Sequence, residues 1–172
     1  MFITSGYVFS QQPQQVATTE PRPKRWVAGG DFGLGFSAFG MNARVAPQIG
    51  YMLVPRWEAG LRLTYLYSNI KEMGVRYHFH DVGGGIYTSY DVYKGFFLHG
   101  ENELLSYNKA FFNSGLLTKD RVLANSVFVG LGYRQYFGEN SSTWIMLLYN
   151  INETLDSPYS NPLFRVGFGV GL

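Results

Sequence analysis

The sequence predicts an all-β protein, an eight-stranded antiparallel up-and-down β-barrel that spans a membrane. Segments with apolar residues at every second position recur eight times along the 172 residues, and a period of two is that of a strand with one apolar face. There is no run of about 18 apolar residues, so no helix of this chain would span a bilayer. The 21 glycines and 17% aromatic residues are typical of barrels, which keep their average hydropathy modest by alternation. A soluble β-sandwich is the alternative.

The last ten residues show this alternation most clearly. Apolar side chains occupy every second position from Phe164 to Leu172, whereas Arg165 and three glycines occupy the positions between them. Because no amphipathic helix is predicted that would cover the apolar face, we expect it to meet lipid and the other face to line a narrow lumen.

Residues 1–25 are predicted to lie outside the barrel. Residues 1–10 are short and apolar and are interpreted as a signal-peptide remnant, and residues 11–24, rich in Gln, Thr and Pro, as a polar lead-in. A disordered chain terminus is the alternative. The barrel domain then covers residues 26–172. Its strands are predicted at residues 26–37, 41–53, 57–67, 82–93, 96–107, 124–137, 143–152 and 163–172.

Three of these strands carry special features. In the second strand, Pro47 cannot donate to a ladder and predicts a bulge or locally weak pairing. The fourth strand begins with a run of three glycines, residues 83–85, which would let the sheet bend sharply. In the fifth strand, His99, Glu101 and Glu103 share one face, and three titratable groups in a row are expected to point into the lumen.

The connections differ in length. Short ones follow the even strands, and mostly longer ones, such as residues 68–81, 108–123 and 153–162, follow the odd strands. This is the layout of an outer-membrane barrel with both termini in the periplasm. In the link at 108–123, exposed Phe and Leu side chains at positions 111, 112, 116 and 117 would suit a protein contact, and folding of this loop over the barrel mouth is the alternative.

Strand parity places acids and bases in the lumen in near balance. The inward residues are Asp31, Arg44, Glu58, Arg62, His99, Glu101, Glu103, Arg134 and Arg165. Eight strands enclose a space that side chains nearly fill, so we expect an ion-pair network that closes the lumen. Glu101 and Glu103 are expected to pair with Arg62, Arg134 or Arg44. A narrow channel or proton path through the fifth-strand acids is the alternative.

No residue is predicted to be catalytic. His78, His80 and Asp81 have acid-base residue types at the expected rim, so a lipid-modifying acyltransferase or deacylase is an alternative function. Ser89 lies too deep to serve as its nucleophile, and no G-x-S-x-G motif is present. Two close histidines and no cysteine predict no metal site and no cofactor. The net charge of +2 gives no reason to expect nucleic acid as a partner.

Several segments carry a resemblance. Residues 81–87, 97–103 and 130–137 look like segments of short barrel proteins from Bacteroidota, and the whole barrel resembles the small eight-stranded outer-membrane family that includes the OmpA transmembrane domain and OmpX. Arg165, Gly167, Val170 and Leu172 resemble the targeting signal at the end of such proteins. The resemblance implies a Gram-negative outer membrane, contact with its lipid and insertion by the barrel assembly machinery. We expect a non-enzymatic barrel that presents loops or serves as an accessory subunit of a larger complex.

Overall fold

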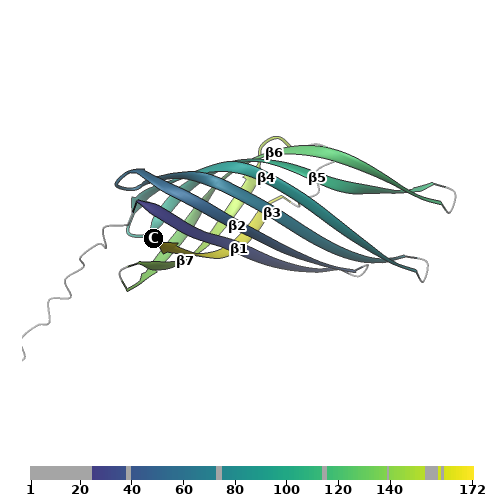
Figure 1. Ribbon diagram of the computed structural model, residues 1–172, viewed down its shortest axis with the longest axis horizontal. Coiled ribbons are helices and arrows are strands. Elements are labelled where there is room, and N and C mark those ends of the chain that lie inside the picture. The colour runs from purple at the N-terminus through teal and green to yellow at the C-terminus, as the bar shows by residue number, and fades with distance from the viewer. Residues whose placement is uncertain are drawn as a thin grey trace, which may run out of the picture.

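The computed structural model describes residues 25–37, 40–72, 75–113, 116–138, 140–153, 159 and 161–172, which form one closed antiparallel barrel (Figure 1). Its strands are β1 (Trp26–Ser37), β2 (Gly40–Val54), β3 (Trp57–Glu72), β4 (Val75–Tyr93), β5 (Phe96–Asn113), β6 (Leu116–Phe137), β7 (Ser141–Asn150) and β8 (Leu163–Gly171). Each strand pairs with its neighbours in the sequence, and β8 pairs with β1. The predicted eight-stranded up-and-down barrel is confirmed, and the two-sheet sandwich is wrong. The predicted N-terminal segment, residues 1–24, lies outside the described residues.

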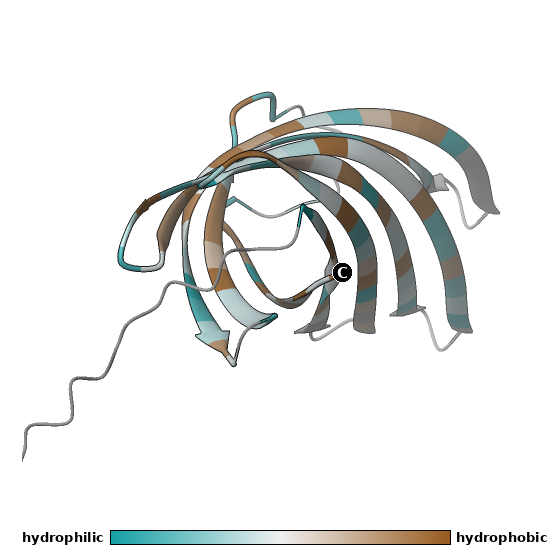
Figure 2. Ribbon diagram, turned by 60° about the vertical axis from the view of Figure 1, so that its left-hand side comes forward, coloured by the Kyte–Doolittle hydropathy of each residue, from teal (hydrophilic) through white to brown (hydrophobic). Residues whose placement is uncertain are grey.

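The barrel is apolar outside and charged inside. Phe32 is 59% exposed whereas the preceding Asp31 is 3% exposed, and Phe164 is 62% exposed whereas Arg165 is 2% exposed. Along the strands in Figure 2, hydrophobic and hydrophilic residues succeed one another. Since successive side chains of a strand point to opposite faces, the alternation in the sequence becomes this division between outside and inside. None of the described residues belongs to a helix long and apolar enough to cross a membrane.

The predicted long links at 68–81 and 108–123 are wrong. The ladder of β3 and β4 continues to the pair Glu72 and Val75, and that of β5 and β6 continues to Asn113 and Leu116. The sequence conceals these extensions because polar residues such as Asn69 and His78, which are cross-strand partners, replace apolar ones on the outer face. The predicted exposure of the side chains at 111, 112, 116 and 117 lies outside what is described.

The strand extensions form two separate arms at the end of the barrel opposite the C-terminus (Figure 1). The ladder between β4 and β5 ends at Val82 and Ser106, that between β6 and β7 at Phe128 and Asn150, and that between β1 and β8 at Phe32 and Val166. Beyond these points, β1 to β4 continue as one sheet, here called the four-stranded arm. The outer parts of β5 and β6, from the pair at 107 and 122 to that at 113 and 116, form the hairpin arm.

Side-chain hydrogen bonds connect the two arms at the level where they separate. Oδ1 of Asp81 accepts hydrogen bonds from the backbone N–H of Asn108 (2.8 Å) and from its side-chain Nδ2 (3.1 Å). Nη2 of Arg121 donates to the backbone carbonyl of His80 at 3.0 Å. Side chains thus connect β4 to the hairpin arm at the level where the backbone ladder has ended.

At Pro47 the ladder is interrupted, as one of the two alternatives predicts. Pairs between β2 and β3 are formed on either side, from Val45 to Tyr65 and from Gln48 to Arg62, with an unchanged register. The proline therefore causes locally weak pairing rather than a bulge, because its nitrogen has no hydrogen to donate.

Candidate functional site

Six charged side chains from five strands meet in the middle of the lumen. This central charge cluster consists of Asp31, Arg44, Arg62, Glu101, Glu103 and Arg165, all of them buried. Oε2 of Glu101 lies 2.7 Å from Nη1 of Arg165 and 3.0 Å from Nη1 of Arg62. Arg62 also reaches Oδ2 of Asp31 with Nη2 at 2.9 Å, and Arg44 binds the other oxygen of that carboxylate. Three acids face three bases, so the formal charges cancel.

Glu103 is held mainly by hydroxyl groups. Tyr159 donates to its Oε2 at 2.5 Å and Thr64 to its Oε1, while Nη2 of Arg44 lies 3.9 Å away. Sequence reasoning missed Tyr159, because this residue comes from the connection before β8, where strand parity gives no orientation. The structure brings Glu101 to Arg62 and Glu103 near Arg44, as expected, but it also adds Arg165 to Glu101.

The predicted pairing of Arg134 with Glu101 or Glu103 is wrong. Arg134 lies nearer the end with the C-terminus, where its Nη2 is 3.3 Å from Oε2 of Glu58 and its Nη1 is 3.5 Å from Oδ1 of Asp91. Tyr87 donates a hydrogen bond to Oε1 of Glu58 at 2.5 Å. Asp91 was missed because it stands beside the turn, although it shares its parity with Tyr87.

A row of three polar side chains adjoins the central charge cluster. Nδ1 of His99 lies 2.8 Å from Oγ of Ser89, its cross-strand partner, and Nε2 of His99 lies 3.2 Å from Oε2 of Glu101. Serine, histidine and carboxylate in this order form an arrangement that can activate a nucleophile. However, Ser89 is only 4% exposed, and the imidazole packs against Tyr87 and Phe97. The row therefore links β4 to β5, and its serine hydroxyl is buried.

The histidines and the aspartate at positions 78, 80 and 81 do not converge on one site. Both histidines are exposed on the outer face, where Nδ1 of His78 lies 2.7 Å from the Tyr67 hydroxyl and Nδ1 of His80 lies 2.7 Å from the Tyr65 hydroxyl. Asp81 is buried on the inner face, because consecutive residues of a strand point to opposite sides. Within the described ranges, no three His, Asp or Glu side chains are grouped to hold a metal.

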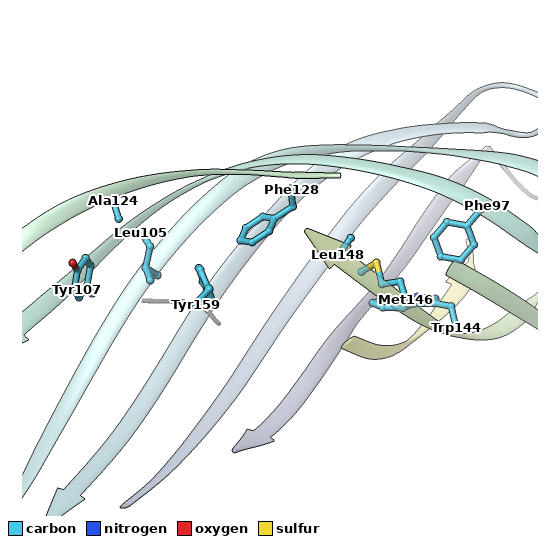
Figure 3. Close-up of a cluster of buried hydrophobic side chains, with 9 residues drawn as sticks. All are labelled: Phe97, Leu105, Tyr107, Ala124, Phe128, Trp144, Met146, Leu148 and Tyr159. Atoms are coloured by element: carbon cyan, nitrogen blue, oxygen red, sulfur yellow. The ribbon is translucent and has the colours of Figure 1, made fainter. Parts of the chain in front are cut away.

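Apolar side chains fill the part of the lumen beside β5, β6 and β7 (Figure 3). This apolar cluster consists of Phe97, Leu105, Tyr107, Ala124, Phe128, Trp144, Met146, Leu148 and Tyr159. It contacts the charged part through arginines that lie over aromatic rings, Arg165 at 4.9 Å from the Phe128 centroid and Arg134 at 5.0 Å from that of Phe97. Ion pairs and apolar side chains together occupy the interior, as expected for eight strands.

The filled lumen predicts that the barrel does not conduct. Reconstituted in liposomes, the wild-type protein is expected to pass no small sugars and to give no steady single-channel current. Swelling assays and planar-bilayer recordings measure this, with a general porin reconstituted at equal density as the control. Reproducible currents from the wild-type protein would show that the interior is an open path.

The fold and its interior define a closed eight-stranded β-barrel whose lumen holds ion pairs and apolar side chains. No protein-family model matches the sequence, and no curated protein matches it. Among solved structures, it is similar to the N-terminal β-barrel domain of Pseudomonas aeruginosa OprF, with 19% identity, 87% of this chain and 97% of that chain covered, and a TM-score of 0.45. It is also similar to the NanC porin, with 11% identity, 86% and 71% covered, and a TM-score of 0.43. Neither likeness bears on what this chain binds or does.

Proposed function

We propose that the chain is a non-enzymatic outer-membrane barrel that presents its arms at the cell surface, as a structural protein or an accessory subunit of a larger membrane complex. The observation that carries the proposal is the combination of a plugged lumen with two strand-built arms beyond the closed part of the barrel. A plug disfavours transport, whereas exposed sheet extensions offer backbone and side chains for recognition.

The outer surface supports the membrane location. Large apolar side chains are exposed on all eight strands, among them Leu61, Leu131 and Phe168, and a surface of this kind is stable in lipid rather than in water. Aromatic residues are exposed near the end with the C-terminus, at Trp26, Trp57, Tyr93, Phe96 and Phe137, and nearer the arms at Tyr65 and Tyr149. Such girdles mark the two membrane interfaces.

Connection lengths support the orientation. The turns at the end with the C-terminus are tight, as between Val54 and Trp57 and between Tyr93 and Phe96, which is typical of the periplasmic side. Both termini would then be periplasmic and the arms extracellular. Arg165, Gly167, Val170 and Leu172 would be read by the barrel assembly machinery during insertion. A relationship to barrels of Bacteroidota stays a prediction.

The non-enzymatic part of the proposal is supported by the two places where chemistry was conceivable. The rim histidines are tied to tyrosines on the outer face, and Ser89 is buried under its neighbours. Neither place combines an accessible nucleophile with a base, which acyl transfer requires.

The membrane location predicts extraction by detergent and heat-modifiable migration on gels. A closed barrel keeps its ladder in sodium dodecyl sulfate until it is boiled, so the unboiled protein is expected to run as a compact species. The measurement is gel migration with and without boiling, after membrane fractionation. Complete solubility in buffer without detergent would contradict the proposal.

The role of the arms is tested by shortening each of them. Deleting residues 109–120 and joining Asn108 to Arg121 through Asn-Gly removes most of the hairpin arm, because these two residues are cross-strand partners and Asn-Gly favours a tight hairpin turn. Deleting residues 71–76 with the same replacement, between the partners Ile70 and Tyr77, shortens the four-stranded arm. Both variants are expected to keep the heat-modifiable barrel.

The readout is what is isolated with the protein from native membranes in mild detergent. We expect a defined partner that accompanies the full chain and is lost in at least one arm variant whose barrel is still folded. Each variant serves as the control for the other, since both shorten the chain by one hairpin end. If the same proteins accompany all three forms, the arms are not the binding element and the proposed role is wrong.

A further inference from the structure

Two carboxamides lie side by side on the outer face of the barrel. Nδ2 of Asn102 on β5 donates a hydrogen bond to Oδ1 of Asn125 on β6 at 2.8 Å. Apolar residues flank the pair: Ile86 and Val127 are the cross-strand partners of Asn102, and Leu104 is the partner of Asn125. Toward the arm, the next residue of β6 is Ala124, which points inward. The next outward residue is Leu123, which is 67% exposed. On the side of β7, Nδ2 of Asn152 donates to the backbone carbonyl of Asn125 at 3.2 Å, so apolar side chains flank the amides on the other sides.

The single hydrogen bond leaves polar groups unsatisfied. Within the part of the chain that the structure describes, no other hydrogen bond is formed by either side-chain amide. Oδ1 of Asn102 thus remains as an acceptor and Nδ2 of Asn125 as a donor, both on side chains of the outer face. Lipid tails offer no partner to either group, and polar side chains at such positions promote association between membrane-spanning elements.

We infer that this face, here called the amide face, binds the same face of a second copy of the chain. The remaining acceptor and donor are complementary to each other, so a two-fold axis through the pair lets each copy satisfy the other. Nδ2 of Asn125 in one copy donates to Oδ1 of Asn102 in its partner, and the reverse bond forms by symmetry. A protein of different sequence would need its own donor and acceptor placed to match this pair, whereas a second copy, related by a two-fold axis, always carries them.

The neighbouring residues allow the two barrels to approach closely. Gly84 and Gly100 have the outward parity of the amide face, and each has room beside its Cα, since an added Cβ would meet nothing nearer than 3.5 Å at Gly84 and 3.6 Å at Gly100. Small residues at a membrane interface bring backbones together and strengthen packing. The inference rests on the proposed membrane location but not on the proposed role of the arms.

Site-specific cross-linking tests the inference, because the chain has no cysteine of its own. Leu104→Cys places a thiol beside the amides, and Phe32→Cys places one on β1, across the barrel. Native membranes are treated with copper-phenanthroline and run on non-reducing gels. We expect a disulfide-linked dimer of this chain from Leu104→Cys and at least ~tenfold less from Phe32→Cys.

The amides themselves are then replaced. Asn102→Leu and Asn125→Leu, each combined with Leu104→Cys, are expected to weaken dimer formation roughly tenfold, as the loss of two interfacial hydrogen bonds within a membrane would do. Thr143→Leu, an outward polar-to-apolar change on β7, is the control and should have no effect. Leucine suits a lipid-facing position, so these variants are expected to fold, and heat-modifiable migration verifies it.

Three outcomes would overturn the inference. Equal dimer formation from both cysteines would show random collision, and dimers unaffected by both leucine variants would show that the amides do not hold the contact. An adduct whose mass differs from twice that of the chain would show that another protein covers the amide face. None of these outcomes affects the arm-dependent isolation experiment, so the two proposals fail separately.

Discussion

Replacing Glu101 with alanine is expected to destabilise the barrel by roughly 3 to 5 kcal/mol, the usual cost of removing one partner from a buried ion pair. Oε2 of Glu101 is the point where Arg62, Arg165 and His99 meet. Without this carboxylate, Arg165 has no acid within ion-pair distance among the described residues. Water admitted to the lumen would hydrate the freed guanidinium groups, which favours the lower end of the range.

A double-mutant cycle measures the pairing. Glu101→Ala and Arg165→Ala are determined alone and together by urea unfolding in detergent, and the double variant is expected to cost clearly less than the sum, since it removes both charges. The control is the cycle of Glu101 with Arg134, which binds Glu58 and Asp91 instead and should be additive within about 0.5 kcal/mol. If both cycles are additive, the central charge cluster does not hold the lumen closed.

Replacing Gly85 with alanine is expected to cost about 3 kcal/mol, the upper end of what overpacking costs. A Cβ at this position would lie 2.1 Å from the backbone oxygen of Asn102 on the adjacent strand. Backbone cannot yield as the end of a side chain can, so the two strands would have to separate and weaken the ladder between β4 and β5.

The neighbouring residue supplies the matched control. At Gly84 an added Cβ would meet its nearest atoms at 3.5 Å, an ordinary contact, so Gly84→Ala should change stability little. Urea unfolding in detergent and the folded fraction on unboiled gels compare the two variants. Equal stability of Gly84→Ala and Gly85→Ala would show that the strands are less closely apposed at this position than the structure indicates.

The alternation of the sequence was sufficient to predict the barrel and the inward position of its charged residues. Asp31 and Arg165, for example, are each buried beside exposed phenylalanines. The arms were not predicted, because the outward apolar residues end before the strands do. The backbone ladder continues beyond them. Residues 68–81 and 108–123 therefore read as links although their backbone is mostly strand.

Parity also could not assign partners across the lumen. It states which face a side chain occupies but not its height, which depends on the tilt and stagger of the strands. Arg134 and Arg165 are both inward, yet only Arg165 reaches Glu101, over a sequence separation of 64 residues. Ser89 and His99 became recognisable as neighbours only once the register of β4 and β5 was known.

The contact between Asp81 and Asn108 lies where the closed barrel gives way to two open sheets. The N–H of Asn108 is directed at β4, where a longer ladder would provide a carbonyl oxygen, but a side-chain carboxylate accepts it instead. The strand edge is thereby satisfied without a further rung. Without this carboxylate, as in Asp81→Ala, the N–H of Asn108 would need water or a further rung of the ladder between β4 and β5 as its acceptor.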